Sequence, residues 1–395
     1  MNDDVARLLA AFDDGTLLRP SADVPNSVDL AHALATACGV TDIDVTPGAA
    51  RIGELLGAPE HVIFVLVDGL GLDAIGRLPE GSILRTHVAL ELRALFPTST
   101  APVLTSLATG LWPGDHGITG WWSYLPKYGV TATVLPFIER FSQRPLAEFG
   151  VDSADVFRRP SLVARYRHAP VSYLPAGIAG SIYSRYSSGD TELRGYAGIS
   201  SAFDAVGFRV TTAKAPSFTY LYLPQYDAAA HEAGPDAPRA LRVLRRIDAM
   251  LARLALRLPE RARIVVSADH GVIGTPRTSV AALAPDDELT AMLLAPPDGD
   301  ARAPRFHLRP GALDRFPDAF RERFGDRFAL LTVDDAQELR LYGPQPIADD
   351  VRERFGDLQG IPLDDSVLVC GADAWLPGNH GGLSPAEMRI PLVLA

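Results

Sequence analysis

The segment VIFVLVDGLG, residues 62–71, decides the fold class of this chain. It is a continuous apolar run, rich in β-branched residues, that ends in Asp68 and two glycines. Such a run is typical of a strand that is buried on both faces, as in a parallel sheet. Runs of related character follow at 218–224, 263–271 and 391–395. The sequence therefore predicts a sheet made mostly of parallel strands.

Helical patterns lie between these strands. The clearest covers residues 236–257, where five apolar side chains share one helical face. Strands that alternate with helices predict a doubly wound α/β fold, in which helices sandwich a mostly parallel sheet. We expect an N-terminal helical segment at 1–57 and one large domain at 58–395. Two stretches break the alternation and are predicted to be insertions: 121–205, over the sheet edge, and 300–365, a small α/β lid.

Composition excludes several classes of protein. The 395 residues carry a net charge of −11, so the chain lacks the basic surface with which proteins bind large nucleic acids. Two distant cysteines, Cys38 and Cys370, offer neither a disulfide framework nor a thiolate zinc site. No apolar run approaches the roughly 20 residues of a membrane helix, and the acidic start does not look like a secretory signal. We expect a cytoplasmic protein that acts away from membranes.

Metal-ligand residue types gather where the predicted strands end, or in glycine-rich turns. Function in open α/β sheets concentrates at the carboxyl ends of strands. Singly, an Asp after a strand is more often a turn former or helix cap, and a lone His is more often a packed residue. Three Asp and three His together can supply two sites for a metal such as zinc. These residues are Asp68, Asp227, His231, Asp269, His270 and His380.

A hydroxyl group stands near them in the string FPTST, residues 96–100. A helical stretch follows, with Pro102 in its first turn, so Thr100 falls at or next to the helix N-terminus. Free backbone N–H groups and the helix dipole make this a natural place for a phosphate. Taken alone, Thr100 is more often a helix cap without chemistry.

Five motifs occur in the order and approximate spacing of a known family. They are VLVDGLG, FPTSTAP followed by HGI, DAAAHEAGP, SADHG and NHGGLSP. Over roughly residues 60–395 the chain resembles the type I phosphodiesterase/nucleotide pyrophosphatase family of the alkaline phosphatase superfamily. The resemblance implies an alkaline-phosphatase-like fold and a two-zinc hydrolase of phosphodiester or pyrophosphate bonds, with manganese or another divalent metal as the alternative cofactor.

The resemblance also implies roles for particular residues. Thr100 would be the nucleophile, would lie between the two metals as a ligand, and would form a phospho-threonine intermediate. The first zinc would be held by Asp227, His231 and His380, and the second by Asp68, Asp269 and His270.

The chain departs from the family in two places. Gly120 and Trp121 stand where the family has Gly-Asn after HGI, and Ala101-Pro102 stands where it has Phe-Pro. We expect Trp121, Trp122 and Ala101 to contact the substrate, although the tryptophans can equally be packing residues. The family's aromatic contact to a nucleobase is missing, so the expected partner is a small phosphorylated molecule, with nucleotides among the candidates.

Two alternatives stay open at this point. Another enzyme of the superfamily, such as a phosphomonoesterase, a phosphonate hydrolase or a phosphomutase-like enzyme, fits the same residues. The second alternative is a catalytically inactive metal-binding module. A basic stretch, Arg158 to Arg167, either contacts a distal phosphate or is a solvated surface.

Overall fold

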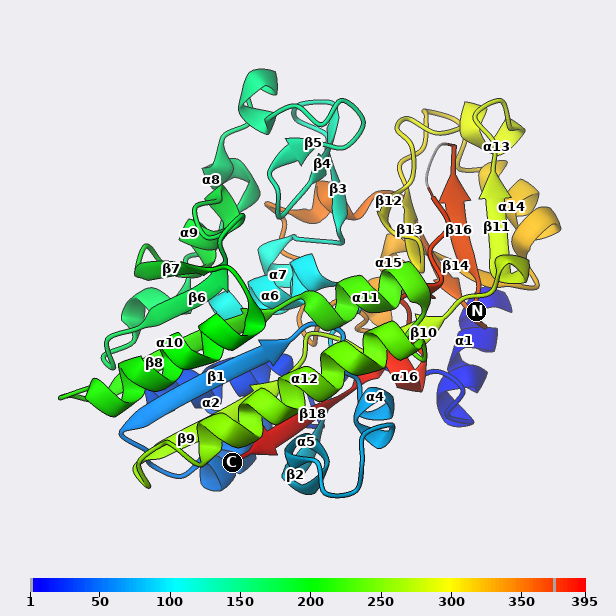
Figure 1. Cartoon of the computed structure of the whole chain (residues 1–395). Helices are drawn as coiled ribbons and strands as arrows, with labels where there is room; N and C mark the ends of the chain where they lie inside the picture. The colour runs from blue at the N-terminus through cyan, green and yellow to red at the C-terminus, as the bar shows by residue number, and fades with distance from the viewer. Residues whose placement is uncertain (1–2, 372–373) are drawn as a thin grey trace.

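The computed structural model describes residues 3–371 and 374–395 and contains two large sheets. The central sheet has seven strands (Figure 1). In spatial order they are β2 (Val88–Arg93), β18 (Arg389–Leu394), β9 (Ala262–Ser267), β1 (His61–Val67), β8 (Ser217–Leu223), β6 (Val171–Pro175) and β7 (Glu192–Tyr196). Only β18 runs antiparallel to its neighbours within this sheet, so the predicted mostly parallel sheet is confirmed.

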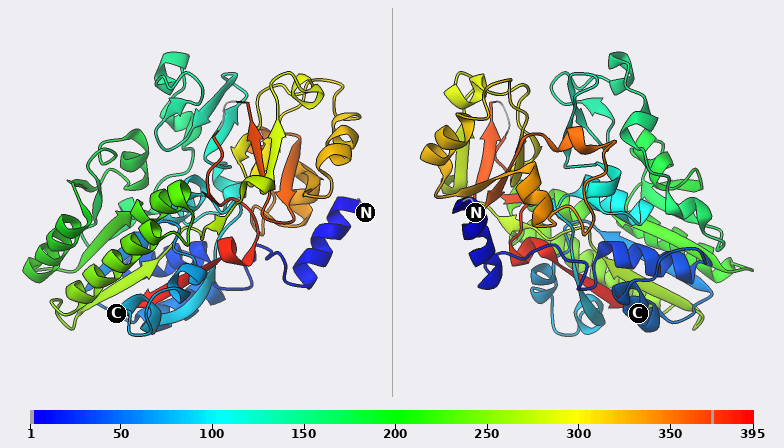
Figure 2. Two further views of the ribbon diagram at one scale, coloured as in Figure 1. Left: turned by 45° about the vertical axis from the view of Figure 1, so that its right-hand side comes forward. Right: turned by 180° about the vertical axis from the view of Figure 1, so that it is seen from behind.

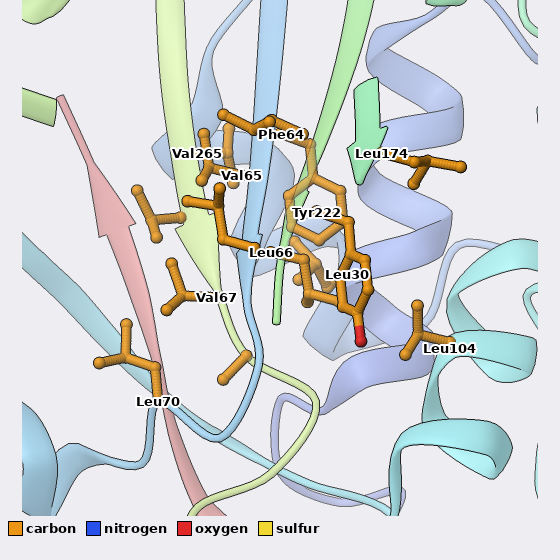
Figure 3. Packing of buried hydrophobic residues seen from close by; sticks show 14 of the residues in the cluster. Leu30, Phe64, Val65, Leu66, Val67, Leu70, Leu104, Leu174, Tyr222 and Val265 are labelled. Atoms are coloured by element: carbon orange, nitrogen blue, oxygen red, sulfur yellow. The ribbon is translucent and has the colours of Figure 1, made fainter. Parts of the chain in front are cut away.

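Strand β1 lies at the centre of this sheet, and all seven of its residues are buried. It pairs in parallel with β8 on one side and β9 on the other. Figure 3 shows its side chains packed with Tyr222 of β8 and Val265 of β9. A strand covered on both faces and both edges needs apolar residues throughout, which is why the run at 62–67 has no polar alternation.

Helices cover both faces of the central sheet (Figures 1 and 2). On one face lie α10 (Ile199–Thr212), α11 (Gln225–Ala233) and α12 (Pro238–Ala255), and on the other lie α2 (Ser27–Ala37), α3 (Pro47–Leu56) and α6 (Thr100–Thr109). The predicted helix at 236–257 is α12, whose buried face includes Leu244, Ile247 and Leu251. In the described part of the chain, no helix combines the length and hydropathy needed to cross a membrane.

The second sheet joins two segments that are far apart in sequence. Its spatial order is β14 (Phe328–Thr332), β15 (Leu358–Pro362), β13 (Ala303–Phe306), β12 (Asp298–Asp300), β3 (Trp122–Leu125), β4 (Val130–Thr133) and β5 (Ile138–Glu139). The two segments meet where β12 pairs antiparallel with β3. Helices α14 (Phe316–Phe324) and α15 (Val333–Glu338) flank β14 in sequence, in the helix–strand–helix order predicted for 300–365.

The prediction that 121–205 is one insertion is wrong in its second half. Strands β6 and β7 belong to the edge of the central sheet, and α10 begins at Ile199. Strand β6 (VSYLP) lies between β8 and β7 and is largely buried, whereas β7 (ELRGY) is the edge strand and is largely exposed. Short strands of this mixed composition lack the apolar run that marks β1, so the sequence pattern did not reveal them.

The three N-terminal helices form as predicted, but they do not share one core. Leu34 of α2 and Ile52 of α3 belong to the hydrophobic core of the central sheet. Helix α1 (Asp3–Asp13) instead buries Leu8 with Ala329 and Leu331 of β14. The predicted boundary at residue 57 therefore does not separate two hydrophobic cores.

A buried ion pair ties the two sheets together. Arg302, between β12 and β13, donates two hydrogen bonds to Glu387 of α16 (Pro385–Met388), at 2.7 Å and 3.0 Å. Both side chains are fully buried. Glu387 also accepts hydrogen bonds from Gly382 N and Ser384 Oγ, in the turn that follows His380. One carboxylate thus fixes the second sheet, the start of β18 and the NHGG turn.

Replacement of Glu387 with Ala should strongly destabilise the protein. The change leaves the Arg302 guanidinium buried without its counter-charge, which costs roughly 3–5 kcal/mol in the free energy of unfolding. The exposed pair Arg389–Glu91 provides a matched control, since Glu91→Ala should cost less than about 1 kcal/mol. Denaturant unfolding measures both losses. Equal losses would show that the buried pair does not connect the sheets energetically.

Candidate active site

Three aspartates meet at the carboxyl ends of neighbouring strands. Asp68 follows β1 directly, and Asp269 lies two residues after the end of β9. Asp227 lies in the first turn of α11, which begins two residues after β8. Because β8, β1 and β9 are adjacent and parallel, their ends lie at the same edge of the sheet. The topology therefore brings together carboxylates that are up to about 200 residues apart in sequence.

Two of the histidines complete one cluster with Asp227. His231 lies four residues after Asp227 on α11, so both side chains share a helical face. His231 Nε2 lies 3.3 Å from Asp227 Oδ2 and 3.1 Å from Nε2 of His380, which follows β17 (Gly378–Asn379). Asp227, His270 and His380 also present ligand atoms that lie within 4.8 Å of one another.

A second cluster contains Asp68, Asp269 and His270, whose ligand atoms also lie within 4.8 Å of one another. His270 Nε2 is 3.3 Å from Asp269 Oδ2 and 3.6 Å from Asp68 Oδ1. All three side chains are buried. The structure thus brings all six predicted metal-ligand residues together, and His270 lies between the two clusters.

Backbone carbonyls orient two of the imidazoles. His231 Nδ1 lies 2.8 Å from Gly378 O, and His380 Nδ1 lies 2.9 Å from Thr98 O. A carbonyl only accepts, so each Nδ1 carries a proton, and each ring, when it is neutral, presents its Nε2 lone pair to the site. His231 and His380 then direct two acceptors at each other, an arrangement that a cation between them satisfies. Metal-binding histidines are usually oriented in this way.

The carboxylates also fit a bound cation. Asp68 Oδ1, Asp227 Oδ1 and Asp269 Oδ2 are buried and accept no hydrogen bond. In the described part of the chain, none of the three carboxylates forms an ion pair with Lys or Arg, although His side chains lie close by. Burial, together with Asp269 and Asp227, raises the pKa of Asp68 well above its usual value. A divalent cation would supply the missing positive charge.

Thr100 faces these clusters from the first residue of α6. Its Oγ1 lies 3.3 Å from His270 Nε2. The other two hydroxyls of FPTST point elsewhere: Thr98 Oγ1 donates to Gly382 O at 2.8 Å, and Ser99 Oγ donates to Asp300 Oδ1 at 2.9 Å. Of these three hydroxyls, Thr100 is therefore the one beside the candidate metal ligands.

The site opens into a cleft of about 780 Å³. Trp121 and Trp122 both line it, and Trp122 also stacks on Arg140, whose guanidinium carbon is 3.6 Å from the ring centre. The prediction that Ala101 contacts the substrate is wrong, because Ala101 is fully buried in the core. One residue after Thr100, the helix has turned by about 100° toward the core. Leu104, four residues after Thr100, lines the cleft instead.

Sequence reasoning missed Asp300, the last residue of β12. It is buried, lines the same cleft as Thr100, and accepts hydrogen bonds from Ser99 Oγ and from Trp121 N at 3.3 Å. Burial raises its pKa to about 6, against the opposing effect of these hydrogen bonds. The string DGD at 298–300 resembles a turn, so no sequence signal pointed to a site.

The basic stretch does not reach this site. Arg158 and Arg159 pair with Asp350, and Arg165 pairs with Asp42. None of the three lines the cleft. Of the two interpretations of this stretch, the structure therefore favours ion pairs near the surface over contact with a distal phosphate.

Comparison with known proteins gives one family. The profile of type I phosphodiesterase / nucleotide pyrophosphatase matches residues 62–382. This range contains β1, the helix that starts at Thr100 and all six clustered Asp and His residues. No curated protein sequence matches the chain significantly.

Solved structures share the fold at low sequence identity. Murine ectonucleotide pyrophosphatase / phosphodiesterase 5 superposes with a TM-score of 0.62 and 18% identity, covering 84% of this chain and 87% of that chain. An inactive Thr-to-Ala variant of that protein, in complex with AMP, superposes with a TM-score of 0.61 and 19% sequence identity. The match again covers 84% of this chain and 87% of that chain. Phosphonoacetate hydrolase from Sinorhizobium meliloti 1021, in complex with phosphonoformate, superposes with a TM-score of 0.60 and 19% sequence identity. This match covers 85% of this chain and 90% of that chain.

Removal of divalent metal should lower the thermal stability of the protein, and more at high pH. Burial lowers the pKa of His231, but the nearby carboxylate of Asp227 outweighs this effect and raises that pKa to about 9. The stabilisation from protonated His231 is complete below its unfolded pKa of about 6.5 and is lost as the pH rises through about 9. The raised pKa of Asp68 acts in the same direction, since its stabilisation is lost above the unfolded pKa of about 3.9.

The midpoint of thermal unfolding, measured with and without chelator at about pH 7 and about pH 9, checks this expectation. The metal-free protein should lose stability between the two pH values, and added divalent metal should restore it. An unfolding midpoint that chelator leaves unchanged at both pH values would contradict the assignment of these clusters to a metal.

Proposed function

The chain belongs to the type I phosphodiesterase / nucleotide pyrophosphatase family, and we propose that it cleaves phosphodiester or pyrophosphate bonds with two divalent ions and a phospho-threonine intermediate. As a member of this family it is a metal-dependent hydrolase that acts on phosphoester bonds. One observation carries the finer proposal: Thr100, and neither Thr98 nor Ser99, directs its hydroxyl at the convergent Asp and His side chains. The murine protein of similar fold is inactive as a Thr-to-Ala variant, which agrees with a threonine in this role.

The two clusters suggest how the metals would be held. Asp227, His231 and His380 would bind one ion, and Asp68, Asp269 and His270 the other. When bound, such ions lower the pKa of a coordinated hydroxyl and neutralise charge on a phosphoryl group. Asp and His ligands suit zinc best, with manganese as the alternative.

The chain's own residues then account for the chemistry. Thr100 Oγ1 loses its proton and attacks phosphorus in line with the leaving group, so that the bond to the departing alkoxide or phosphate oxygen breaks. The N–H groups at the start of α6 face the phosphoryl oxygens, as at other helix N-termini that bind anions. Water then attacks phosphorus on the opposite side from Thr100 Oγ1. This second displacement releases the phosphate product and restores the Thr100 hydroxyl.

The shape and polarity of the cleft favour a diester over a monoester. Its walls are largely apolar and include Leu104, Leu135, Leu174 and Ile178. No Lys or Arg appears among the described residues that line it. The third oxygen of a dianionic monoester needs its own cationic or hydrogen-bonding partner, and these walls offer no cationic side chain for it. An apolar wall accommodates the second ester group of a diester.

Elemental analysis of protein purified without chelator should find two zinc ions per chain. Asp227→Ala and His380→Ala should each lose one ion preferentially, because both residues are assigned to the same site. Asp269→Ala, from the other cluster, is the matched control and should lose the other ion. A content near zero that zinc, manganese or magnesium does not restore would exclude the two-metal mechanism.

Thr100→Ala should lower kcat by several orders of magnitude while both metals stay bound, because the hydroxyl acts in the chemical step. Thr100→Ser should keep part of the activity. Ser99→Ala is the neighbouring control, and its loss should be far smaller. If Ser99→Ala or Thr98→Ala were the more damaging change, the nucleophile would be assigned to the wrong residue of FPTST.

The unmutated enzyme should prefer an aryl phosphodiester to the matching monoester by at least about tenfold in kcat/KM, or roughly 1.4 kcal/mol. Trp121→Ala should weaken diester turnover more than monoester turnover, because the ester group packs against this ring. Equal losses would make Trp121 a packing residue. A preference for monoesters, or efficient cleavage of a phosphonate, would move the assignment to another enzyme of the superfamily.

A further inference from the structure

Asp300 carries a charge that the mechanism above does not use. Ser99 Oγ donates to its Oδ1 at 2.9 Å, and Trp121 N donates to its Oδ2 at 3.3 Å. Hydrogen bonds accepted by both oxygens of a carboxyl group favour its ionised form. Both donors are neutral, and no Lys or Arg forms an ion pair with Asp300 among the residues that the structure describes. The two groups that donate hydrogen bonds to Asp300 therefore bring no positive charge to it.

Asp298, on the same strand, shows what a compensated carboxylate looks like in this fold. It lies 3.6 Å from Arg305 Nη1 and 3.6 Å from His307 Nε2, and it accepts a hydrogen bond from Tyr124 N. It is not part of the cleft lining. Asp298 thus lies beside Arg305 and His307, whereas Asp300, which lines the cleft, forms no ion pair with a Lys or Arg among the described residues.

The contacts of Asp300 place it next to the reacting group. One partner, Ser99, immediately precedes Thr100, and the other, Trp121, lines the cleft. Gly381, the residue after His380, packs so closely that an added Cβ would lie 3.0 Å from Asp300 Cβ. Asp300, at the end of β12, therefore contacts three segments of the site: the turn before Thr100, the loop that carries Trp121, and the NHGG turn at 379–382.

We propose that Asp300 determines which phosphate charge the cleft accepts: it disfavours a dianionic phosphate monoester and leaves the monoanionic group of a phosphodiester bound. The inference rests on the proposed function, since it concerns the phosphoryl group that Thr100 attacks. A fixed like charge in a largely apolar cleft discriminates by repulsion, a common means of rejecting the wrong ligand. Asp300 is here a specificity-determining residue, whereas the bond-making group remains Thr100.

Asp300→Asn tests the charge with almost no change of shape. The ratio of kcat/KM for the monoester to that for the matching diester should rise at least about fivefold. Asp298→Asn makes the same substitution on the same strand and should leave this ratio unchanged, even if it lowers the unfolding midpoint. Ser99→Ala removes a hydrogen bond but keeps the charge, so it should not favour the monoester either.

A binding measurement separates this inference from the proposed function. Calorimetry with inorganic phosphate at about pH 8, where it is mainly the dianion, should give at least about fivefold tighter binding to metal-loaded Asp300→Asn than to the unmutated protein. Tighter phosphate binding without turnover of either ester would support the role of Asp300 and contradict the proposed function. An unchanged ratio and an unchanged affinity, with metals retained, would make Asp300 a positioning residue. Loss of metal from Asp300→Asn would make it a metal ligand. Either result overturns the inference.

Discussion

Three buried carboxylates that form no ion pair with Lys or Arg among the described residues govern the candidate site of this protein. Asp68, Asp227 and Asp269 lie at one edge of the central sheet, and each has a buried oxygen that accepts no hydrogen bond. Burying ionised groups is costly unless an opposite charge compensates them. The surrounding residues are arranged for a cation, because backbone carbonyls direct the Nε2 atoms of His231 and His380 toward the same space. The need for positive charge therefore explains both the ligand set and its orientation.

The second sheet contributes one wall of the cleft beside this charged edge. It brings Trp121 and Asp300 to the site from segments about 180 residues apart, through the pairing of β3 with β12. The buried pair Arg302–Glu387 holds that sheet against the turn that carries His380. The same ion pair thus connects the sheet that carries Trp121 and Asp300 with the turn that carries His380.

Much of this arrangement was predictable from sequence. The fully apolar run at 62–67 predicted the central strand, because a strand buried on both faces needs apolar residues throughout. Asp and His at strand ends predicted which side chains converge, because the ends of adjacent parallel strands lie at one edge of the sheet. Strands β6 and β7 were missed because neither has a long apolar run: β7 is an exposed edge strand, and β6 is a short buried strand that contains Ser172 and Tyr173. Ala101 was misplaced because a helix turns adjacent residues to different faces, and only the folded backbone shows which face meets the cleft.

Asp300 illustrates a further limit. Its importance comes from contacts with Ser99 and Trp121, about 200 and 180 residues away in sequence, and no local pattern records such contacts. The two insertions were predicted separately, whereas the structure joins them into one sheet. Pairing between distant strands depends on the complete fold. Local patterns in a single sequence therefore did not predict that β3 pairs with β12.

The central claim is that Thr100 takes the phosphoryl group before water does. The stereochemical course of hydrolysis tests it most directly. A diester made chiral at phosphorus with sulfur, hydrolysed in water labelled with heavy oxygen, reports whether one or two displacements occur. The account predicts net retention of configuration at phosphorus, because two in-line displacements each invert it. Net inversion would show that water attacks the substrate directly, and it would contradict a covalent role for Thr100.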